Sequence, residues 1–503
     1  MGVIKALDGN AAIAHGVMRS KVQLVAAYPI TPQTPIVETI ASLIDKKEYA
    51  ATYITAESEH SAISAVVGAA STGVRTFTAS ASHGLALMHE LTGTCSASRL
   101  PAVMAVVSRA IPGPMALWCD HSDIMTQRDQ GWIQIFAKDP QEALDFTMIA
   151  YRVSEDERVL IPTMVDIDGF FCSHLTEPVN VPTEEEAERF VKEFKPVNAH
   201  LDTDLPYAMN NLTSPAIFTE IKRSQDLGMR AAAGVMDERF EEFGELFGRK
   251  YGRIMCDHVE GADTVVLCMG SMSGTVKHVV KEMRAAGRKV GICRVVAFRP
   301  FPTKEVAEAL KGAKNIAVID RVSAMGSFGP LYEEVLAAMN YGGIKANAYS
   351  FVAGLGGRDI WEQTVENVID KAEELGAKQV VCKALSALHA RVLERVGADR
   401  VIQPEKEMGQ RLAQHLGRTN VVDFIGLSDE FSILEIKTPK SWVGKSLGQL
   451  GVRAKYDVNV LGIRHGEGGH VDVTPRPDDR IEENDLLLIL GTNNKVNKVV
   501  ELK

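Results

Sequence analysis

Three residues in the first quarter of the chain could carry chemistry if folding brings them together: Thr31, Glu59 and Arg109. A carboxylate such as Glu59, held in a pocket at a sheet edge, can share a proton with a heterocycle nitrogen. An arginine such as Arg109 can bind a carboxylate group through two parallel hydrogen bonds. Thr31 lies in the segment 28–32, which begins a helical pattern whose free N–H groups would favour an anion.

Each residue also has an ordinary structural explanation. Thr31 followed by Pro32 fits the start of a helix. An acidic residue in a first helical turn, such as Glu59, interacts favourably with the helix dipole. An arginine just past the end of a strand, such as Arg109, often forms a surface ion pair. The segment 118–123 mixes Asp and His but lacks a metal-ligand spacing, so we expect it to form hydrogen bonds around the pocket.

The surrounding sequence predicts a parallel sheet that would position these residues. Apolar residues recur at helical spacing over 36–44, and short apolar runs typical of buried strands cover 24–28, 76–79, 102–107 and 162–167. Strands that alternate with helices imply βαβ units. Such sheets bind ligands at the carboxyl ends of their strands, which is where Thr31 and Arg109 fall.

Further along the chain the pattern predicts additional units. Residues 180–250 are polar, and we expect a connector with helical pieces there. Strands at 264–269, 290–296 and 316–319 predict a second α/β unit, whose Gly270–Gly274 turn has the spacing of a nucleophile elbow but Met272 at its centre. After residue 372, short strands and helices indicate a smaller α+β module. The predicted boundaries are 1–245, 246–372, 373–420 and 421–503.

Composition excludes several functions. The formal charge of −10 shows that the chain has no excess of basic residues, which argues against binding of nucleic acid. The most apolar stretch, 100–118, is interrupted by charged and proline residues, so we expect no membrane span. Seven dispersed cysteines with no C-x-x-C spacing argue against an iron–sulfur or zinc site in this chain. They suggest a reducing, cytoplasmic location.

Residues 1–370 resemble the alpha subunit of pyruvate:ferredoxin oxidoreductases. The matching segments follow in order along the chain: YPITPQTP (28–35), ESEHSAISAVVGA (57–69), RTFTASASHGLALMHE (75–90), RLPAVMAVVSRA (99–110), DHSDIMTQRDQGWIQIFA (120–137), VDIDGF (165–170), RPFP (299–302), DRVSAMGSFGPLYEE (320–334) and AGLGGRD (353–359). The resemblance implies a pyrimidine-binding domain for thiamine diphosphate, followed by a unit like the transketolase C-terminal domain.

The resemblance also implies roles for individual residues. Glu59 would hydrogen-bond the aminopyrimidine ring, and Pro29 would lie beside the cofactor. Thr31 and Arg109 would hold the carboxylate of the 2-oxoacid. The family decarboxylates 2-oxoacids, transfers the acyl group to coenzyme A and passes electrons to ferredoxin, so the cofactor performs the carbon chemistry while the protein orients it.

Missing motifs imply partner subunits. The chain has no G-D-G motif with a downstream Asn, so the Mg²⁺–diphosphate anchor is expected on a beta subunit. The [4Fe–4S] clusters are expected on gamma and delta, ferredoxin-like subunits. We therefore expect this chain to be inactive alone.

Residues 375–503 resemble a second family, the cytosolic RCK-type regulators of Trk/Ktr potassium uptake. Segments 374–413, 431–439, 443–447, 450–463 and 480–491 carry the resemblance. Only the end of that family's Rossmann half is present, without its Gly-rich nucleotide loop, and a half-Rossmann layer should expose apolar surface. The complete part resembles the C-terminal ligand-sensing domain, which implies a possible cyclic dinucleotide ligand with Arg453 as a phosphate contact. The alternative is a dimerisation module or a functionless fusion.

Two other functions compete with a pyruvate-specific enzyme. The chain could be a potassium-transport regulator with an oxidoreductase-like passenger, but its tail has lost the nucleotide loop while Thr31, Glu59 and Arg109 are all present. It could also be the same enzyme class acting on 2-oxoisovalerate or 2-oxoglutarate.

Overall fold

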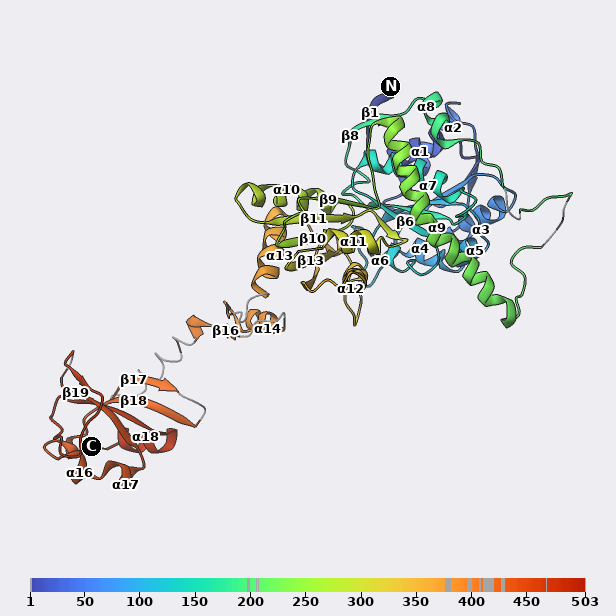
Figure 1. The fold of residues 1–503 in the computed structure, drawn as a ribbon. Helices are drawn as coiled ribbons and strands as arrows, with labels where there is room; N and C mark the ends of the chain where they lie inside the picture. Colours follow the sequence, from blue (N-terminus) through green and yellow to red (C-terminus); the bar gives the residue numbers. More distant parts are fainter. Residues whose placement is uncertain are drawn as a thin grey trace. The chain divides into compact units, whose positions relative to one another are not determined.

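The computed structural model describes residues 2–196, 200–204, 206, 208–375, 381–395, 400–406, 409, 420–426, 430–466 and 468–502. The chain divides into two compact units, Met1–Ala377 and Lys378–Lys503 (Figure 1). The first unit contains two α/β domains, and each unit is described below by itself.

The first domain is built on a seven-stranded sheet in the order β12-β6-β7-β5-β4-β2-β3. The strands are β2 (Leu24–Ala27), β3 (Thr52–Thr55), β4 (Thr76–Ser80), β5 (Val103–Ser108), β6 (Ile133–Ala137), β7 (Thr163–Asp168) and β12 (Ala297–Arg299). All pairs are parallel except β12 with β6. Residues of β5 are buried throughout, as expected for a strand covered on both faces. The predicted α/β fold is confirmed.

Helices cover both faces of this sheet. One face packs against α1 (Gly9–Arg19), α2 (Thr34–Asp45), α7 (Pro140–Ser154) and α9 (Pro215–Phe247), and the other against α3 (Glu59–Ala70), α4 (Ser82–Leu87) and α5 (His89–Ala97). At the start of α7, Asp139 accepts a hydrogen bond from the Glu142 amide at 2.9 Å and Pro140 occupies the first turn, a favourable beginning for a helix. A short antiparallel pair, β1 (Val3–Leu7) with β8 (Glu177–Val181), completes the domain with α6 (Ser122–Met125) and α8 (Glu184–Val191).

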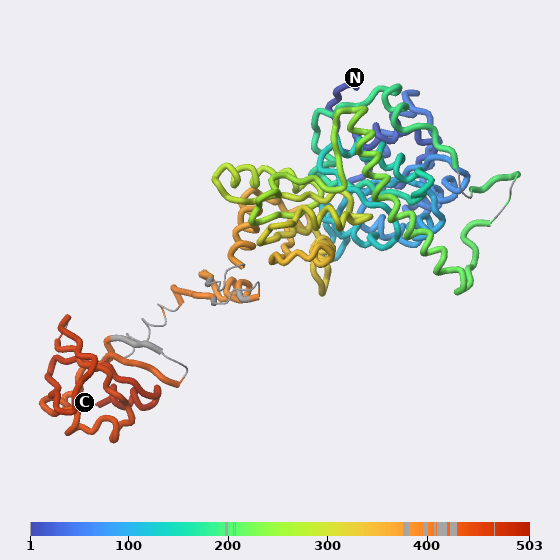
Figure 2. Tube along the Cα trace, viewed as in Figure 1, coloured from blue at the N-terminus to red at the C-terminus, as the bar shows by residue number. Residues whose placement is uncertain are grey.

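Two predictions for this domain were wrong in detail. Residues 180–250 contain the expected helical pieces, α8 and α9, but they are not a polar connector, because α9 is a 33-residue helix whose Val235, Phe240 and Phe243 are buried in the core. Its amino-terminal end projects away from the sheet (Figure 2), where Ile217 and Phe218 are exposed. Secondly, Thr31 and Pro32 do not start a helix. They form part of a turn, and α2 begins later, at Thr34.

The second domain is a five-stranded sheet in the order β14-β13-β10-β11-β9. Its strands are β9 (Ile254–Asp257), β10 (Thr264–Cys268), β11 (Val290–Val295), β13 (Asn315–Asp320) and β14 (Asn347–Val352). Its helices are α10 (Met272–Ala285), α11 (Thr303–Ala309), α12 (Pro330–Gly342) and α13 (Glu362–Leu375), with a 3₁₀ turn η1 (Leu355–Gly357). Only the edge strand β9 runs antiparallel. Strand β12 follows β11 and joins the first sheet, so the two domains share hydrogen bonds.

The second unit contains a short parallel pair and a five-stranded antiparallel sheet. The pair is β15 (Val381–Lys383) with β16 (Arg400–Ile402), next to α14 (Ala387–Arg395). The sheet has the order β17-β18-β21-β19-β20, with β17 (Val421–Gly426), β18 (Phe431–Lys437), β19 (Asn459–Arg464), β20 (Val471–Asp472) and β21 (Leu486–Thr492); η2 (Lys440–Trp442), α16 (Leu447–Leu450), α17 (Val452–Tyr456) and α18 (Asn493–Val500) complete it.

The expected half-Rossmann layer is only partly described. Its strand–helix–strand portion is present, whereas most of the helix expected after residue 405 lies outside the described residues. Leu385, Leu388 and Val392 are between 50% and 78% exposed, in agreement with the apolar surface expected for an incomplete layer. None of the helices in the described part of the chain has both the length and the apolar character needed to cross a membrane.

Candidate active site at the carboxyl ends of the first sheet

Glu59 is the first residue of α3, just after strand β3, and its side chain is 6% exposed. The Ser58 hydroxyl caps the helix by accepting the Ser61 amide at 3.2 Å. Within the described residues, the Glu59 carboxylate forms no hydrogen bond or ion pair. Because burying an ionisable group without a partner is unfavourable, this carboxylate is available to a ligand.

Gly84 leaves the space in which Glu59 lies. A Cβ atom at position 84 would lie 2.5 Å from Glu59 Oε1 and 2.8 Å from Ser80 Oγ. The Ser80 hydroxyl, at the end of β4, is buried and also has no hydrogen-bond partner. Two polar groups without partners therefore converge beside a position where only glycine fits.

Arg109, directly after β5, is 2% exposed and contacts the segment that contains Thr31. Its Nη1 donates to the Thr31 carbonyl at 3.0 Å, and its Nε donates to the Ala116 carbonyl at 2.9 Å. Its Nη2 is buried without a partner. Arg109 therefore does not form a surface ion pair, and the N–H groups of its Nη2 remain available to an acceptor.

Asp123 links the Arg109 and Glu59 sides of the site. Its Oδ2 accepts the backbone amides of Arg109 at 3.0 Å and of Ser82 at 2.7 Å. Ser82, two residues before Gly84, has a φ of +51°, a backbone conformation that is costly for a residue with a side chain and is often found at functional sites. Burial raises the pKa of Asp123 to about 6, although the amide hydrogen bonds oppose this shift.

The segment that carries Pro29 and Thr31 is held in place by hydrogen bonds to its backbone, while Pro29 and Thr31 themselves are exposed. The Gln33 amide donates to the carbonyls of Tyr28 and Ala79, both at 2.9 Å. Asn10 donates to the Pro32 carbonyl at 3.0 Å. The structure thus brings Thr31 and Arg109 into contact and places Pro29 and Glu59 at the same sheet edge, where β3, a strand that was not predicted, precedes Glu59.

A second polar cluster, which sequence reasoning missed, joins the two α/β domains. Asp168, the last residue of β7, is fully buried and accepts hydrogen bonds from His121 Nε2 at 2.6 Å and Arg321 Nη1 at 2.9 Å. The Ser271 amide donates to the same carboxylate at 2.9 Å, and its hydroxyl also bonds to it. We call Asp168, His121, Arg321 and Ser271 the junction cluster.

Opposite charges within the junction cluster stabilise one another. Burial opposes ionisation, but Arg321 and His121 hold the pKa of Asp168 below its usual range. The charge and hydrogen bond of Asp168 likewise outweigh burial and raise the pKa of His121. Ligand atoms of Cys119, His121 and Asp168 lie within 4.8 Å of one another. However, the Arg321 guanidinium is 3.6 Å from Cys119 Sγ, so a metal ion would have to displace this cation.

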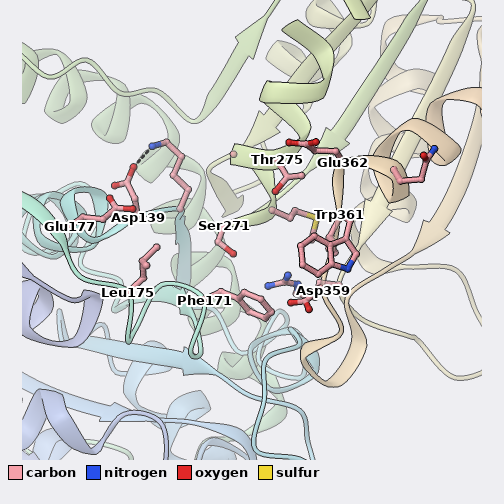
Figure 3. A pocket seen from close by; sticks show the side chains of 15 residues that line it. Asp139, Phe171, Leu175, Glu177, Ser271, Thr275, Asp359, Trp361 and Glu362 are labelled. Carbon is pink, nitrogen blue, oxygen red and sulfur yellow. Dashed lines mark hydrogen bonds and ion pairs between the residues drawn. The ribbon is translucent and has the colours of Figure 1, made fainter. Parts of the chain in front are cut away.

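A cleft of about 860 Å³ opens beside the junction cluster. Figure 3 shows Ser271 in its middle, with Phe171 and Leu175 on the first-domain side and Trp361 on the other. The Gly270–Gly274 turn borders it, and the Ser271 amide and hydroxyl both point to Asp168 rather than to the cleft. The turn therefore serves the contact between the two α/β domains.

Comparison with known proteins assigns both α/β domains. Residues 15–241 match the family model "Pyruvate flavodoxin/ferredoxin oxidoreductase, thiamine diP-bdg", and residues 262–374 match "Pyruvate:ferredoxin oxidoreductase core domain II". The pyruvate synthase subunit PorA of Methanocaldococcus jannaschii is 42% identical over 374 residues, which are 74% of this chain and 95% of that protein. The chain belongs to the pyruvate:ferredoxin oxidoreductase family.

Two further relatives have similar identities to this chain, and one solved structure shares its fold. PorA of Thermotoga maritima is 44% identical over 73% of this chain and 94% of its own length. The ketoisovalerate oxidoreductase subunit VorA of Pyrococcus horikoshii is 42% identical over 75% and 94%. A solved 2-oxoglutarate:ferredoxin oxidoreductase from Magnetococcus marinus has the same fold, with a TM-score of 0.56 and 21% identity over 74% of this chain and 65% of that one.

The tail is assigned separately, because residues 431–503 match the TrkA-C domain model. The predicted family and the predicted RCK-type tail are therefore both confirmed. The roles of Pro29, Thr31, Glu59 and Arg109 stay predictions.

Proposed function

We propose that this chain is the pyrimidine-side subunit of a 2-oxoacid:ferredoxin oxidoreductase that acts on pyruvate. The observation that carries the proposal is the buried, unpartnered Glu59 carboxylate next to Gly84, in a domain that belongs to a thiamine diphosphate-binding family. The reaction would decarboxylate pyruvate, transfer the acetyl group to coenzyme A and pass electrons to ferredoxin.

The residues at this edge fit an aminopyrimidine ring. Glu59 and the Ser80 hydroxyl offer hydrogen bonds that no group in the described chain uses, and Gly84 leaves room for them. When bound, thiamine diphosphate would supply the nucleophilic carbon and the electron sink that decarboxylation of a 2-oxoacid requires. Glu59 would hold the proton that favours the imino form of the pyrimidine, and Pro29, exposed on the adjoining turn, would lie beside the cofactor.

Thr31 and Arg109 would bind the carboxylate of pyruvate. The free Nη2 of Arg109 is a charged donor without an acceptor, and the exposed Thr31 side chain lies on the segment that Arg109 contacts. Hydrogen bonds between charged groups contribute more than neutral ones. Arg109 therefore orients the substrate, while Asp123 positions Arg109 through its backbone amide.

Arg109→Ala should raise the apparent KM for pyruvate about 10- to 100-fold, because a hydrogen bond to a charged group contributes about 1.5–3 kcal/mol. The kcat value should change less. Initial rates of the assembled enzyme measure both constants. Arg99→Ala is the control, since Arg99 also donates to backbone carbonyls, those of Val159, Leu160 and Ser224, but lies before β5 rather than after it. An unchanged KM in Arg109→Ala would exclude carboxylate binding.

Partner subunits would supply the remaining groups. We assign the Mg²⁺–diphosphate anchor to a beta subunit and the [4Fe–4S] clusters to gamma and delta subunits, because this sequence lacks the corresponding motifs. The seven cysteines of the chain are free thiols, in keeping with a reducing cytoplasmic location. The whole assembly, and not this chain alone, would be active.

2-Oxoisovalerate is a second candidate substrate, favoured by the 42% identity to VorA. The test is to assemble this chain with its partner subunits and measure coenzyme A-dependent reduction of ferredoxin with each 2-oxoacid in turn. We expect the highest kcat/KM with pyruvate. A higher kcat/KM with 2-oxoisovalerate would make that compound the preferred substrate. If no 2-oxoacid supports reduction of ferredoxin, the proposed enzyme function is wrong.

The tail should be dispensable for catalysis. Residues 1–377 form a compact unit, and the PorA relatives match this part of the chain over nearly their whole length. Ending the chain at Ala377 should therefore leave kcat within about twofold, because this cut keeps all of α13 as described, Glu362–Leu375. Steady-state kinetics and size-exclusion chromatography of the assembled enzyme measure the result. Loss of assembly would instead show that the tail is needed to hold the subunits together.

The tail could sense a cyclic dinucleotide. A hollow of about 470 Å³ is lined by Arg453 together with Leu447, Val458 and Pro477. The exposed Arg453, in α17, would contact a phosphate. Titration calorimetry of the full chain with cyclic di-AMP, compared with Arg453→Ala, tests this assignment. The potassium-regulator alternative rests on this match over residues 431–503 alone.

A further inference from the structure

Two cysteines in the second domain occupy facing positions on neighbouring strands. Cys256 lies in β9, and Cys293 lies opposite it in β11, in antiparallel register. Side chains of directly opposed residues point to the same face of a sheet. Figure 1 shows β9 beside β11, at the edge of the second sheet.

The ladder places this pair where side chains approach most closely. The Val296 amide donates to the Arg253 carbonyl at 2.9 Å, which makes Arg253 and Val296 a hydrogen-bonded pair. Bonded and non-bonded pairs alternate along an antiparallel ladder, and three steps further Cys256 and Cys293 form a non-bonded pair. Such pairs have Cα atoms about 4.5 Å apart, within the roughly 4.4–6.8 Å that a disulfide requires.

The two thiols differ in accessibility and in acidity. Cys256 is exposed, whereas Cys293 is fully buried. The neighbouring Cys293 thiol lowers the pKa of the Cys256 thiol. By contrast, burial raises the pKa of Cys268, in the neighbouring strand, to about 12. The more accessible thiol is thus also the more readily ionised one, as a reactive cysteine requires.

We propose that Cys256 and Cys293 are a peroxide-reactive dithiol that closes to an intrachain disulfide between β9 and β11. The Cys256 thiolate attacks one oxygen of hydrogen peroxide, the O–O bond breaks, and hydroxide leaves and takes up a proton to form water. Cys256 is then a sulfenic acid. The Cys293 sulfur attacks Cys256 Sγ, its proton and the sulfenic hydroxyl leave as a second water, and the S–S bond forms. The sum is two thiols plus one peroxide giving one disulfide and two waters.

The disulfide would join an edge strand to its neighbour without moving either backbone. β9 is a four-residue edge strand that pairs only with β11 among the described strands. The cross-link would hold it in place while the peroxide is consumed. A thiol-based reductant would restore both cysteines, so the modification is reversible.

The test uses the full chain, purified under reductant without oxygen and exposed to a small molar excess of hydrogen peroxide. Free thiols are then alkylated, and peptides are analysed by mass spectrometry with and without dithiothreitol. We expect a linked Cys256–Cys293 peptide lighter by two hydrogen atoms, which dithiothreitol separates. A Cys256 that remains alkylatable, or that proceeds to sulfinic acid while Cys293 stays reduced, would overturn the proposal.

Single substitutions test whether the disulfide forms specifically between Cys256 and Cys293. Cys256→Ser, at an exposed position, should abolish the linked peptide and leave Cys293 alkylatable after unfolding. Cys293→Ala should leave a sulfenic acid at Cys256 that dimedone traps. Cys95→Ala, a buried cysteine of the first domain, should leave the linked peptide unchanged. Dimedone labelling of Cys382 in place of Cys256 would refute the assignment.

Discussion

Replacing Glu59 with glutamine is expected to lower the kcat of the assembled enzyme by about 100- to 10,000-fold, the range that a positioned acid–base group contributes. Glutamine keeps the size and most of the hydrogen-bonding shape of the side chain but cannot hold the proton in the same way. Pre-steady-state and steady-state assays with pyruvate measure the loss. The midpoint temperature of thermal unfolding should be unchanged or slightly higher, because the buried carboxylate has no partner in the described chain.

Two further variants separate a catalytic effect from a structural one. Gly84→Ala places a methyl group 2.5 Å from Glu59 Oε1, so it should displace the carboxylate and lower kcat while leaving position 59 intact. Glu57→Gln removes an exposed carboxylate two residues away and should leave kcat unchanged. Near-normal turnover in Glu59→Gln would remove the basis for its proposed role.

The buried strands were predictable from sequence because parallel strands covered on both faces consist of short apolar runs. Strands β2, β4, β5 and β7 all lie within about two residues of the predicted runs. The long helix α9 was missed for the opposite reason. The exposed face of α9 is rich in Glu, Asp and Arg, so the average character of the helix is polar. The apolar residues Val235, Phe240 and Phe243 are too few among them to stand out in the sequence.

The candidate site was predictable where each residue follows a strand, and not where it depends on contacts across the fold. Arg109 and Thr31 meet because both follow parallel strands of one sheet. The use of Asp123 to hold Ser82 and Arg109 depends on loop geometry that no local pattern encodes. The junction cluster joins residues 153 positions apart in sequence, Asp168 and Arg321. One signal was available: an aspartate inside a buried strand implies a charged partner elsewhere.

Asp168→Asn is expected to destabilise the first unit by about 3–5 kcal/mol, the cost of removing one partner from a buried ion pair. The substitution would leave the Arg321 guanidinium buried without a carboxylate, in contact with the Cys119 thiol and the Phe171 ring. It would also weaken the bonds from His121 and Ser271. Denaturant unfolding of the full chain, followed by intrinsic fluorescence, measures the change.

The pH dependence of Asp168→Asn provides an independent check on the ion pair. Because Arg321 and His121 depress the pKa of Asp168 in the folded state, this carboxylate adds stability above its unfolded pKa of about 3.9. That contribution is lost as the pH falls through the lower, folded-state pKa. The Asp168 part of the difference in unfolding free energy between wild type and Asp168→Asn should therefore be present at pH 7 and be lost in strong acid. The part that comes from the raised pKa of His121 should be lost as the pH rises through that pKa. Asp359→Asn, an exposed carboxylate of the same cleft, should change stability by less than about 0.5 kcal/mol. An equally small effect at Asp168 would mean that apolar packing, and not the junction cluster, holds the two domains together.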